Sequence, residues 1–179
     1  EGLRYSAKEK PKLIHRLDKQ TSGILILARS LKSAAFAGDL FKNKKIKKTY
    51  LAVLSGKVLR TKGKIDIPII NKYKESDAMT LYETLFTSKN LSLVKINPLT
   101  GRKHQIRKHF FLKGMPILGE TKFIKPSEKK KINDELFLHA FKTEFNSLDG
   151  EKIIIRADLP VYFKRILEQN NITLDYSKI

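Results

Sequence analysis

Apolar residues in this chain occur either in short runs, typical of strands, or at wider spacings, typical of helices. The run Ile24–Ala28 predicts a buried strand, and Ser30 behind it predicts the cap of a helix that continues to about Lys45. The inward face of that helix is expected to carry Leu31, Ala34, Ala35 and Leu40 or Phe41. Further strands are predicted at Thr49–Leu54, Ile65–Ile70, Thr80–Thr87 and Leu91–Ile96. The turn residues Lys89-Asn90 between the last two indicate a meander.

The second half of the chain predicts two more helices and a strand pair. Ile106 and Phe110 at helical spacing favour a helix over Arg102–Lys113, which Gly114 would stop. After a charged loop over Glu120–Asp134, the sequence predicts a strand pair and a last helix, at Leu136–Phe145, Lys152–Ala157 and Pro160 to about Gln169. The fold class expected from this order is α+β, with a mixed, largely antiparallel sheet and flanking helices. No repeat or linker divides residues 1–179, so we expect one domain.

Composition narrows the class of protein. The chain has 179 residues, of which 41% are hydrophobic and 10 are Phe, enough for the core of one folded domain. Its 37 Lys and Arg against 18 Asp and Glu give a net charge of +19, which indicates a polyanionic partner such as RNA. The absence of Cys excludes disulfides and thiolate metal sites and agrees with a reducing cytosol. No apolar run approaches the roughly 20 residues that span a bilayer. We therefore expect a cytoplasmic protein without a membrane segment, and a monomer.

The segment Leu13–Ala28 is the most informative, because it sets one carboxylate among cations just before the predicted strand. Asp18 lies between Arg16 and Lys19, although surfaces that face phosphates normally exclude carboxylates. The cationic neighbours favour the ionised form of the carboxyl group. Asp18 is therefore either tied up locally or retained for chemistry.

A second segment, Thr100–Arg107, places Arg102 and Lys103 in the first turn of the predicted helix. Cations at that position oppose the helix dipole at a cost of roughly 0.3–1 kcal/mol each. An anion at the same end, either Asp18 or an RNA phosphate, would offset the cost. The alternative is that both side chains bend into solvent.

A third segment, Lys48–Gly56, carries Tyr50 in alternation with Ala52 and Leu54. On its own this pattern favours a core tyrosine with a satisfied hydroxyl. A lysine cluster around its start either stabilises the end of the predicted helix or contacts phosphates: Lys42, Lys44, Lys45, Lys47 and Lys48. A later group is more typical of a solvated loop: Lys125, Lys129, Lys130 and Lys131.

The sequence gives no sign of a metal site or a cofactor. Four histidines lack companion Cys or paired carboxylates at ligand spacing: His15, His104, His109 and His139. Two of them, His104 and His109, are five positions apart, which does not put two ligands on one helix face. No Gly-rich phosphate loop is present either. We therefore expect neither a metal nor a nucleotide cofactor.

Taken together, the three segments resemble the RluA family of RNA pseudouridine synthases. The motifs His-Arg-Leu-Asp-x-x-Thr-Ser-Gly, Lys-x-Tyr-x-Ala-x-Val and Thr-Gly-Arg-x-His-Gln-Ile-Arg-x-His occur in the family's order. The likeness continues through Gly114–Ile117 and Leu138–Ala140, and Glu1–Arg4 is similar to the RluC branch, which acts on large-subunit ribosomal RNA. The resemblance implies a pseudouridine synthase fold and a cofactor-free isomerase.

The resemblance also implies a role for each matching residue. Asp18 would be the catalytic carboxylate, which attacks C1′ of uridine or assists loss of its 2′-proton, and Arg107 would pair with it. Tyr50 would stack on the target uracil and take part in removal of its C5 proton. Arg16 would fill the gap left by the extruded nucleotide, and Ile106 would form an apolar wall. Further substrate contacts are expected from Arg102, His104 and Lys48, while Thr21, Ser22 and Gly23 would shape the turn that presents the carboxylate.

The chain also departs from the family pattern. The segment with a Lys-Pro pair that usually precedes the first motif has no match apart from Lys10-Pro11. We therefore expect the N-terminal part of the catalytic domain and the small S4 RNA-binding domain to be absent, which would leave an unpaired sheet edge. Glu120–Phe123 stands where the family more often has an Asp and a Tyr. We expect that difference to touch none of the catalytic residues.

The leading hypothesis is an isomerase that makes pseudouridine in RNA, most of all in large-subunit (23S) ribosomal RNA, with tRNA as the alternative substrate. A non-catalytic RNA-binding or ribosome-assembly protein on the same fold is the alternative from another class. The +19 charge supports both. The joint presence of Asp18, Tyr50 and Arg107 favours the enzyme, because a pure binder has no use for a carboxylate in its RNA cleft. A basic nuclease would need paired carboxylates or two suitably placed histidines, and neither pattern is present.

Overall fold

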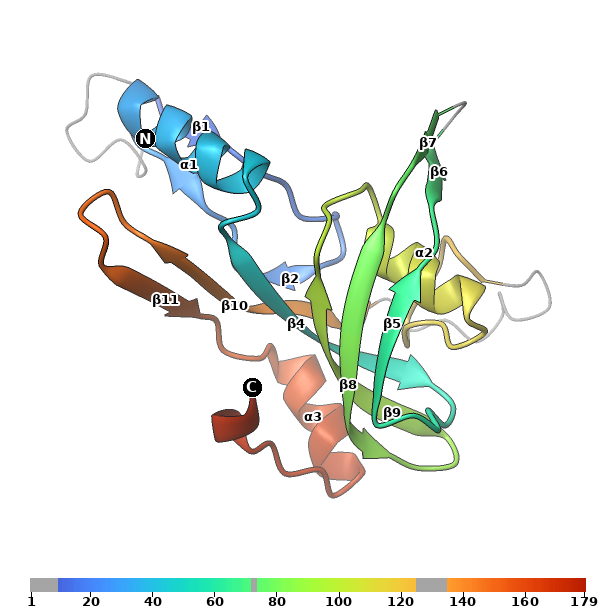
Figure 1. Cartoon of the computed structure of the whole chain (residues 1–179). Helices are drawn as coiled ribbons and strands as arrows, with labels where there is room; N and C mark the ends of the chain where they lie inside the picture. Colours follow the sequence, from blue (N-terminus) through green and yellow to red (C-terminus); the bar gives the residue numbers. More distant parts are fainter. Residues whose placement is uncertain (1–9, 72–73, 125–134) are drawn as a thin grey trace.

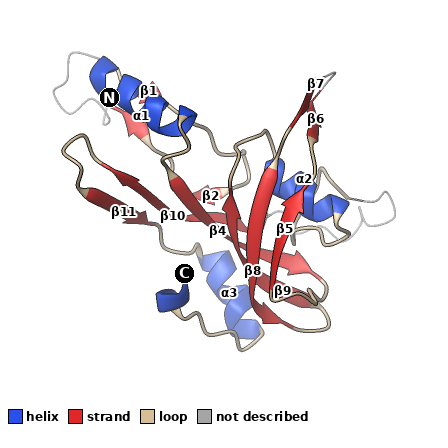
Figure 2. Cartoon of the chain, in the orientation of Figure 1, coloured by secondary structure: helices blue, strands red, loops and turns tan. Residues whose placement is uncertain are grey.

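The structure, a computed structural model, describes residues 10–71, 74–124 and 135–179 (Figure 1, Figure 2). Its helices are α1 Leu31–Lys42, α2 Gln105–Leu112 and α3 Val161–Gln169, followed by a 3-10 helix over Tyr176–Lys178. Its strands are β1 Lys12–Leu13, β2 Ser22–Gly23, β3 Leu27–Ala28, β4 Lys47–Ser55, β5 Lys62–Asp66, β6 Ile69–Asn71, β7 Lys74–Ser76, β8 Met79–Thr87, β9 Leu91–Pro98, β10 Leu138–Asn146 and β11 Lys152–Arg156. The α+β class predicted from the sequence is confirmed.

A seven-stranded sheet organises the protein. Its order is β11-β10-β4-β9-β8-β5, each neighbouring pair antiparallel, and β2 joins β10 in parallel. This is the mixed, largely antiparallel sheet that the sequence predicts. Strand β4 lies in its interior, and Leu51–Leu54 have no exposed surface. The rest of the core packs around these four residues.

Helix α2 covers one face of the sheet (Figure 1). Directly paired residues on antiparallel strands point to the same face. Tyr50, Ile96 and Tyr82 form one such row across β4, β9 and β8. The Tyr82 ring packs edge-on against Phe110 of α2, with centroids 5.6 Å apart. Tyr50 therefore points to the same face as α2.

Helix α3 covers the opposite face. Leu51, the residue after Tyr50, pairs with His139 of β10, and both point away from α2. The His139 ring lies 6.4 Å from that of Phe163, which is fully buried in α3. Helix α3 begins after Pro160, as predicted. Helices α2 and α3 thus pack on opposite faces of the sheet. The candidate site lies on the α2 face.

The predicted strand Ile24–Ala28 is wrong in its extent. The chain forms two short strands there, with β2 beside β10 and β3 beside β1. The backbone N–H of Ile26 donates to His15 Nε2 at 2.8 Å instead of to a neighbouring strand, which interrupts the ladder. Leu25 is 46% exposed for the same reason.

Helix α1 is shorter than predicted. Ser30 forms the expected cap through a reciprocal capping box with Ser33. The helix ends at Lys42, and Lys44 adopts a left-handed φ of 54°. Leu31 and Ala35 are exposed, contrary to expectation, because α1 packs on the narrow β1–β3 ribbon (upper left of Figure 1), while Leu40 is buried.

Two further expectations change. The predicted strand Ile65–Ile70 is split between β5 and the separate β6–β7 hairpin, because Pro68 cannot donate to a ladder. The predicted loop Glu120–Asp134 has no regular element over residues 121–124, and 125–134, with its lysines, lie outside the described residues. None of the three described helices is long and apolar enough to cross a membrane.

Candidate active site

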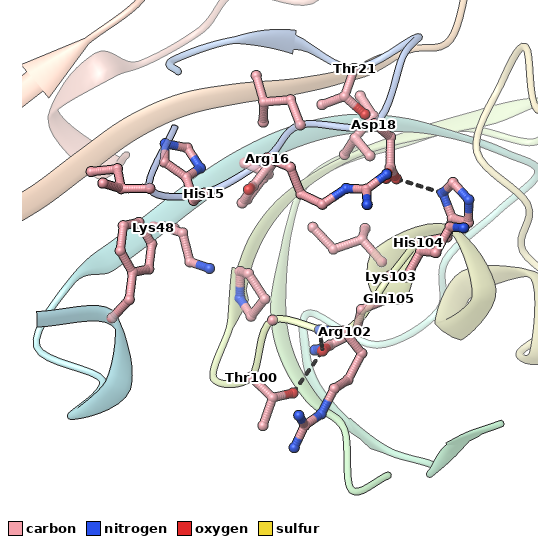
Figure 3. Close-up of a pocket in the computed structure, with 18 residues that line it drawn as sticks. His15, Arg16, Asp18, Thr21, Lys48, Thr100, Arg102, Lys103, His104 and Gln105 are labelled. Atoms are coloured by element: carbon pink, nitrogen blue, oxygen red, sulfur yellow. Dashed lines mark hydrogen bonds and ion pairs between the residues drawn. The ribbon is translucent and has the colours of Figure 1, made fainter. Parts of the chain in front are cut away.

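A hollow on the α2 face measures about 340 Å³ and is called the Asp18 pocket (Figure 3). It lies between the segment before β2, strand β4 and the residues that lead into α2. Seven of the eight residues predicted for catalysis or substrate binding line it: Arg16, Asp18, Lys48, Tyr50, Arg102, His104 and Ile106. The eighth, Arg107, does not. Segments far apart in the sequence thus meet at one site.

Asp18 reaches the pocket from a tight turn in which the backbone N–H of Thr21 donates to the Asp18 carbonyl at 2.9 Å. The carboxylate is 16% exposed, and its Oδ2 lies 3.0 Å from Nδ1 of His104 (Figure 3). The two groups are close enough for an ion pair but not aligned for a hydrogen bond, and the Thr21 hydroxyl also has no partner among the described residues. Buried polar atoms without partners mark a place where a ligand can supply them.

The residues after this turn fasten it to the sheet. Gly23 has a φ of 104°, and a Cβ there would overlap the Ala140 carbonyl, so only glycine lets β2 approach β10 so closely. His139 Nε2 donates to the Ala157 carbonyl, which leaves Nδ1 to accept from the Ser22 hydroxyl at 2.9 Å. These contacts fix where the chain before β2 presents Asp18.

Tyr50 and Ile106 line the pocket with an aromatic and an aliphatic side chain. Burial, together with the nearby charge of Asp18, raises the pKa of the Tyr50 phenol to about 12. The hydroxyl is therefore protonated at neutral pH and is available as a hydrogen-bond donor, not as a phenolate base.

The cations around the pocket differ in their settings. Lys48 lies over the Phe41 ring at 5.8 Å, and burial lowers the pKa of its ammonium group. Burial, followed by the charge of Lys48, also lowers the pKa of His15. Arg16 is exposed at the rim. Of the lysine cluster at 42–48, Lys48 is the member that lines the pocket.

The start of α2 differs from the prediction. The helix begins at Gln105, so Arg102 and Lys103 precede it and do not oppose its dipole from the first turn. His104 takes a left-handed φ of 56°, a conformation that is uncommon for residues other than glycine. The Gln105 amide holds this backbone: its Oε1 accepts from the Thr100 hydroxyl and the Arg102 N–H, at 2.7 and 3.0 Å.

The predicted pairing of Arg107 with Asp18 is wrong. Arg107 forms a two-pronged ion pair with Glu120, Nε to Oε2 at 2.7 Å and Nη2 to Oε1 at 2.5 Å, and the two side chains are 4% and 1% exposed. The carboxylate also accepts from the backbone N–H of Lys122 and Phe123. Burial alone would raise the pKa of Glu120, but the hydrogen bonds from Arg107 and the two N–H groups lower it below the usual value.

The sequence predicts a loop after Glu120, but the expectation that this loop touches none of the catalytic residues is wrong. The Phe123 ring lies 5.6 Å from the His104 ring and 5.5 Å from the Arg107 guanidinium. Lys122 Nζ lies 3.5 Å from His104 Nε2. Lys122 and Phe123 of this loop therefore contact the His104 ring and support its position. One signal was available: Glu120 is the first acid after Glu83 and follows a strongly basic helix.

The described part of the chain contains no set of side chains that could bind a metal ion. No three His, Asp or Glu side chains there come close enough to hold an ion. The pocket instead joins a single carboxylate, a protonated phenol and several cations, which suits acid–base or nucleophilic chemistry on an anionic substrate.

Comparisons with known proteins identify the family. A family model described as RNA pseudouridylate synthase matches residues 1–111, which include the Asp18 turn, Tyr50 and the start of α2. The chain therefore belongs to the RNA pseudouridylate synthase family, which confirms the resemblance drawn from its motifs.

Individual relatives carry the same description. A ribosomal large subunit pseudouridine synthase C of Rickettsia bellii is 37% identical over 87% of this chain and 56% of its own length. An uncharacterized RNA pseudouridine synthase of Zymomonas mobilis is 34% identical over 90% of this chain and 79% of its own length. The chain thus spans little more than half the length of the Rickettsia relatives it matches.

A solved structure supports the fold. The human RNA pseudouridylate synthase domain containing 4 protein superposes with a TM-score of 0.79 and 25% identity, over 93% of this chain and 78% of that chain.

Proposed function

We propose that this chain converts uridine to pseudouridine in RNA. The observation that carries the proposal is the placing of Asp18: a carboxylate 16% exposed, without an aligned hydrogen bond, in a pocket otherwise rimmed by cations. An RNA-binding surface gains nothing from such a group, because a carboxylate repels phosphates. A reaction at the sugar of a bound nucleotide does need it.

The reaction breaks the C1′–N1 bond of uridine, turns the uracil and joins its C5 to C1′, while C5 loses a proton and N1 gains one. In the proposed role, Asp18 either attacks C1′ or takes the 2′-proton, so that the sugar stays bound while the base turns. Tyr50 and Ile106 confine the detached uracil between an aromatic and an apolar side chain. Since the Tyr50 phenol stays protonated, it donates to a uracil oxygen, and removal of the C5 proton needs another acceptor.

Cations at the rim supply the contacts to RNA. Arg16 is exposed above the pocket and is the candidate to occupy the space of the extruded nucleotide. Lys48 and Arg102 both line the pocket, where phosphates beside the target can reach them. For Arg107 we propose an indirect role: paired with Glu120, it holds the loop that supports His104.

The substrate we propose is large-subunit ribosomal RNA. This choice rests on the relatives, since those of Rickettsia bellii and Borreliella burgdorferi bear the names ribosomal large subunit pseudouridine synthase C and D. A tRNA is the alternative substrate.

The test is pseudouridine mapping by carbodiimide labelling and primer extension. Unmodified large-subunit ribosomal RNA and an unmodified tRNA pool are each incubated with the wild-type chain or with Asp18→Asn, which keeps the size of the side chain. We expect new stops in the ribosomal RNA with the wild type and a loss of at least about 10³-fold with Asp18→Asn. Stops in tRNA alone would overturn the substrate, near-normal activity of the variant would overturn the role of Asp18, and no stops in either RNA would overturn the function.

A further inference from the structure

A second hollow lies on the same face of the sheet as the Asp18 pocket. It measures about 290 Å³ and is called the Tyr82 pocket; it is lined by Lys57, Val58, Leu59, Arg60, Lys64, Ile65, Tyr82, Lys113 and Met115. Tyr82 belongs to the row that begins with Tyr50, so both pockets open on the α2 face. No residue of this second hollow lines the Asp18 pocket.

Helix α2 separates the two pockets. His104–Ile106 at its start line the Asp18 pocket, whereas Lys113 and Met115, just beyond its end, line the Tyr82 pocket. A helix of 8 residues is about 12 Å long, at about 1.5 Å per residue. A nucleic acid strand that leaves the Asp18 pocket can therefore reach the Tyr82 pocket without crossing to another face.

The floor of the Tyr82 pocket is apolar. The Tyr82 ring lies across Gly63 of β5, where a Cβ would overlap the ring, so the glycine allows the aromatic side chain to lie flat against the sheet. Val58, Ile65 and Met115 complete the floor. Leu59 stands at its edge with 83% of its surface exposed, the largest exposed fraction among the large hydrophobic residues described. Leu59 therefore extends the apolar floor to the surface of the protein.

The rim is cationic. Lys57, Arg60 and Lys113 are all exposed, and no carboxylate among the described residues forms an ion pair with them. Lys64 differs, since its ammonium group lies 2.8 Å from Asp66. No acidic residue lines the pocket. An apolar floor inside a ring of cations is complementary to one nucleotide of a single strand, with the base on the floor and the phosphate at the rim.

We propose that the Tyr82 pocket binds a single-stranded nucleotide of the same RNA whose target uridine enters the Asp18 pocket. The base lies against Leu59 and the floor, and the flanking phosphates contact Lys57, Arg60 and Lys113. The proposal rests on the proposed function only in taking RNA as the ligand, and it adds a specificity element: a substrate needs an unpaired segment on one side of its target.

The test uses two RNAs and two charge-matched variants of the 179-residue chain. One RNA is a stem-loop with the target uridine, and the other is the same stem-loop with single-stranded flanks on both sides. The rim variant is Lys57→Gln/Arg60→Gln/Lys113→Gln. The control variant, Arg156→Gln/Lys164→Gln/Arg165→Gln, removes three exposed cations from β11 and α3, away from the α2 face. Dissociation constants are measured at several KCl concentrations.

For the flanked RNA we expect the rim variant to bind about 10- to 100-fold more weakly at low salt. In a plot of the logarithm of the association constant against the logarithm of the KCl concentration, the magnitude of the slope should fall by about 2. Each phosphate contact that a single strand loses lowers this magnitude by roughly 0.7. The bare stem-loop should bind both variants alike. An equal loss with the control variant, or no loss with the rim variant, would overturn the proposal; the second result would leave an acidic protein segment as the occupant to examine.

A neutral substitution tests the floor. Leu59→Ser keeps every cation, so we expect about 5-fold weaker binding of the flanked RNA with an unchanged salt slope, because the base loses its apolar contact. Unchanged affinity would overturn the placing of the base. Pseudouridine formation at saturating RNA is measured in parallel: binding at this pocket without any product would contradict the proposed function and leave the second site standing.

Discussion

Two carboxylates near α2 have opposite settings. Glu120 is 1% exposed and fully used: Arg107 contacts both its oxygens, and two backbone N–H groups donate to it. Asp18 is 16% exposed, and Nδ1 of His104, 3.0 Å from its Oδ2, is not aligned for a hydrogen bond. Both acids lie in a strongly basic part of the chain, so charge alone does not separate them.

The difference distinguishes a carboxylate that stabilises the fold, such as Glu120, from one that can take part in a reaction, such as Asp18. A buried carboxylate that has all its hydrogen bonds is fixed in place, and its removal leaves a cation unpaired. A carboxylate that keeps free lone pairs at the floor of an open pocket can still accept a proton or form a bond. Substitution of the first kind of carboxylate should therefore change the free energy of unfolding, and substitution of the second should change the rate of turnover.

The largest expected effect is on folding. We expect Glu120→Gln to lower the free energy of unfolding by about 3 to 5 kcal/mol, because it leaves the Arg107 guanidinium buried without a counter-charge. Urea unfolding followed by circular dichroism measures this loss. Asp18→Asn should leave the midpoint unchanged under the same conditions.

Glu83→Gln is the matched control for Glu120. Glu83 pairs with Lys95 and Lys62 at the surface, with 33% of its side chain exposed. Such a pair contributes at most about 1 kcal/mol. If both glutamine variants lost the same stability, the buried pair would not be the element that holds the loop.

Acid should act on the same pair. Hydrogen bonds from Arg107 and two backbone N–H groups outweigh burial and hold the pKa of Glu120 below its ordinary 4.5. The unfolded state therefore takes up the proton first as the pH falls, and the stability that the carboxylate contributes above that pH is lost. We expect the free energy of unfolding to decline below about pH 4.5, and the decline to be shallower in Glu120→Gln. Parallel curves for the two proteins would contradict this linkage.

Much of the sheet was predictable because local pattern and final pairing agree in it. Strands β4, β8, β9, β10 and β11 follow apolar or alternating runs, and Pro160 marks the start of α3. The split between β2 and β3 was not predictable, since it depends on the hydrogen bond between Ile26 and His15, eleven residues away along the chain. A periodicity argument sees only neighbours in sequence.

The site shows the same limit. The motifs placed Asp18, Tyr50 and Ile106 in one pocket, because each belongs to a recognisable segment. They predicted the wrong carboxylate as the partner of Arg107. Its actual partner, Glu120, lies 13 residues further along the chain, a separation that no helical or strand spacing connects. The left-handed backbone at His104 was also invisible, as it depends on the Gln105 side chain bonding back to Thr100 and Arg102.

A smaller effect should follow from His104, the residue that joins the two regions. Asn tolerates the left-handed backbone that His104 adopts, so His104→Asn keeps the turn and removes the ring that touches Asp18 and Phe123. We expect kcat to fall about 10-fold through misplacement of the carboxylate, with KM unchanged. Single-turnover and steady-state pseudouridine assays measure both.

Lys44→Asn is the control, because Lys44 has a similar φ of 54° and does not line the Asp18 pocket. Its kcat should match that of the wild type. If His104→Asn raised KM and left kcat unchanged, His104 would be a substrate contact and not a positioning residue.

The smallest expected effect is on RNA affinity, and it distinguishes a catalytic role of Asp18 from a structural one. In a catalytic site Asp18 is retained in spite of its charge, which repels the phosphates that approach Arg16 and Lys48. Asp18→Asn should then bind RNA as tightly as the wild type or up to a few-fold more tightly, with the same salt slope, because no phosphate contact is lost. Filter binding at several KCl concentrations measures both quantities. A variant that bound RNA tenfold more weakly would make Asp18 a structural acid like Glu120, and the contrast between the two carboxylates would fail.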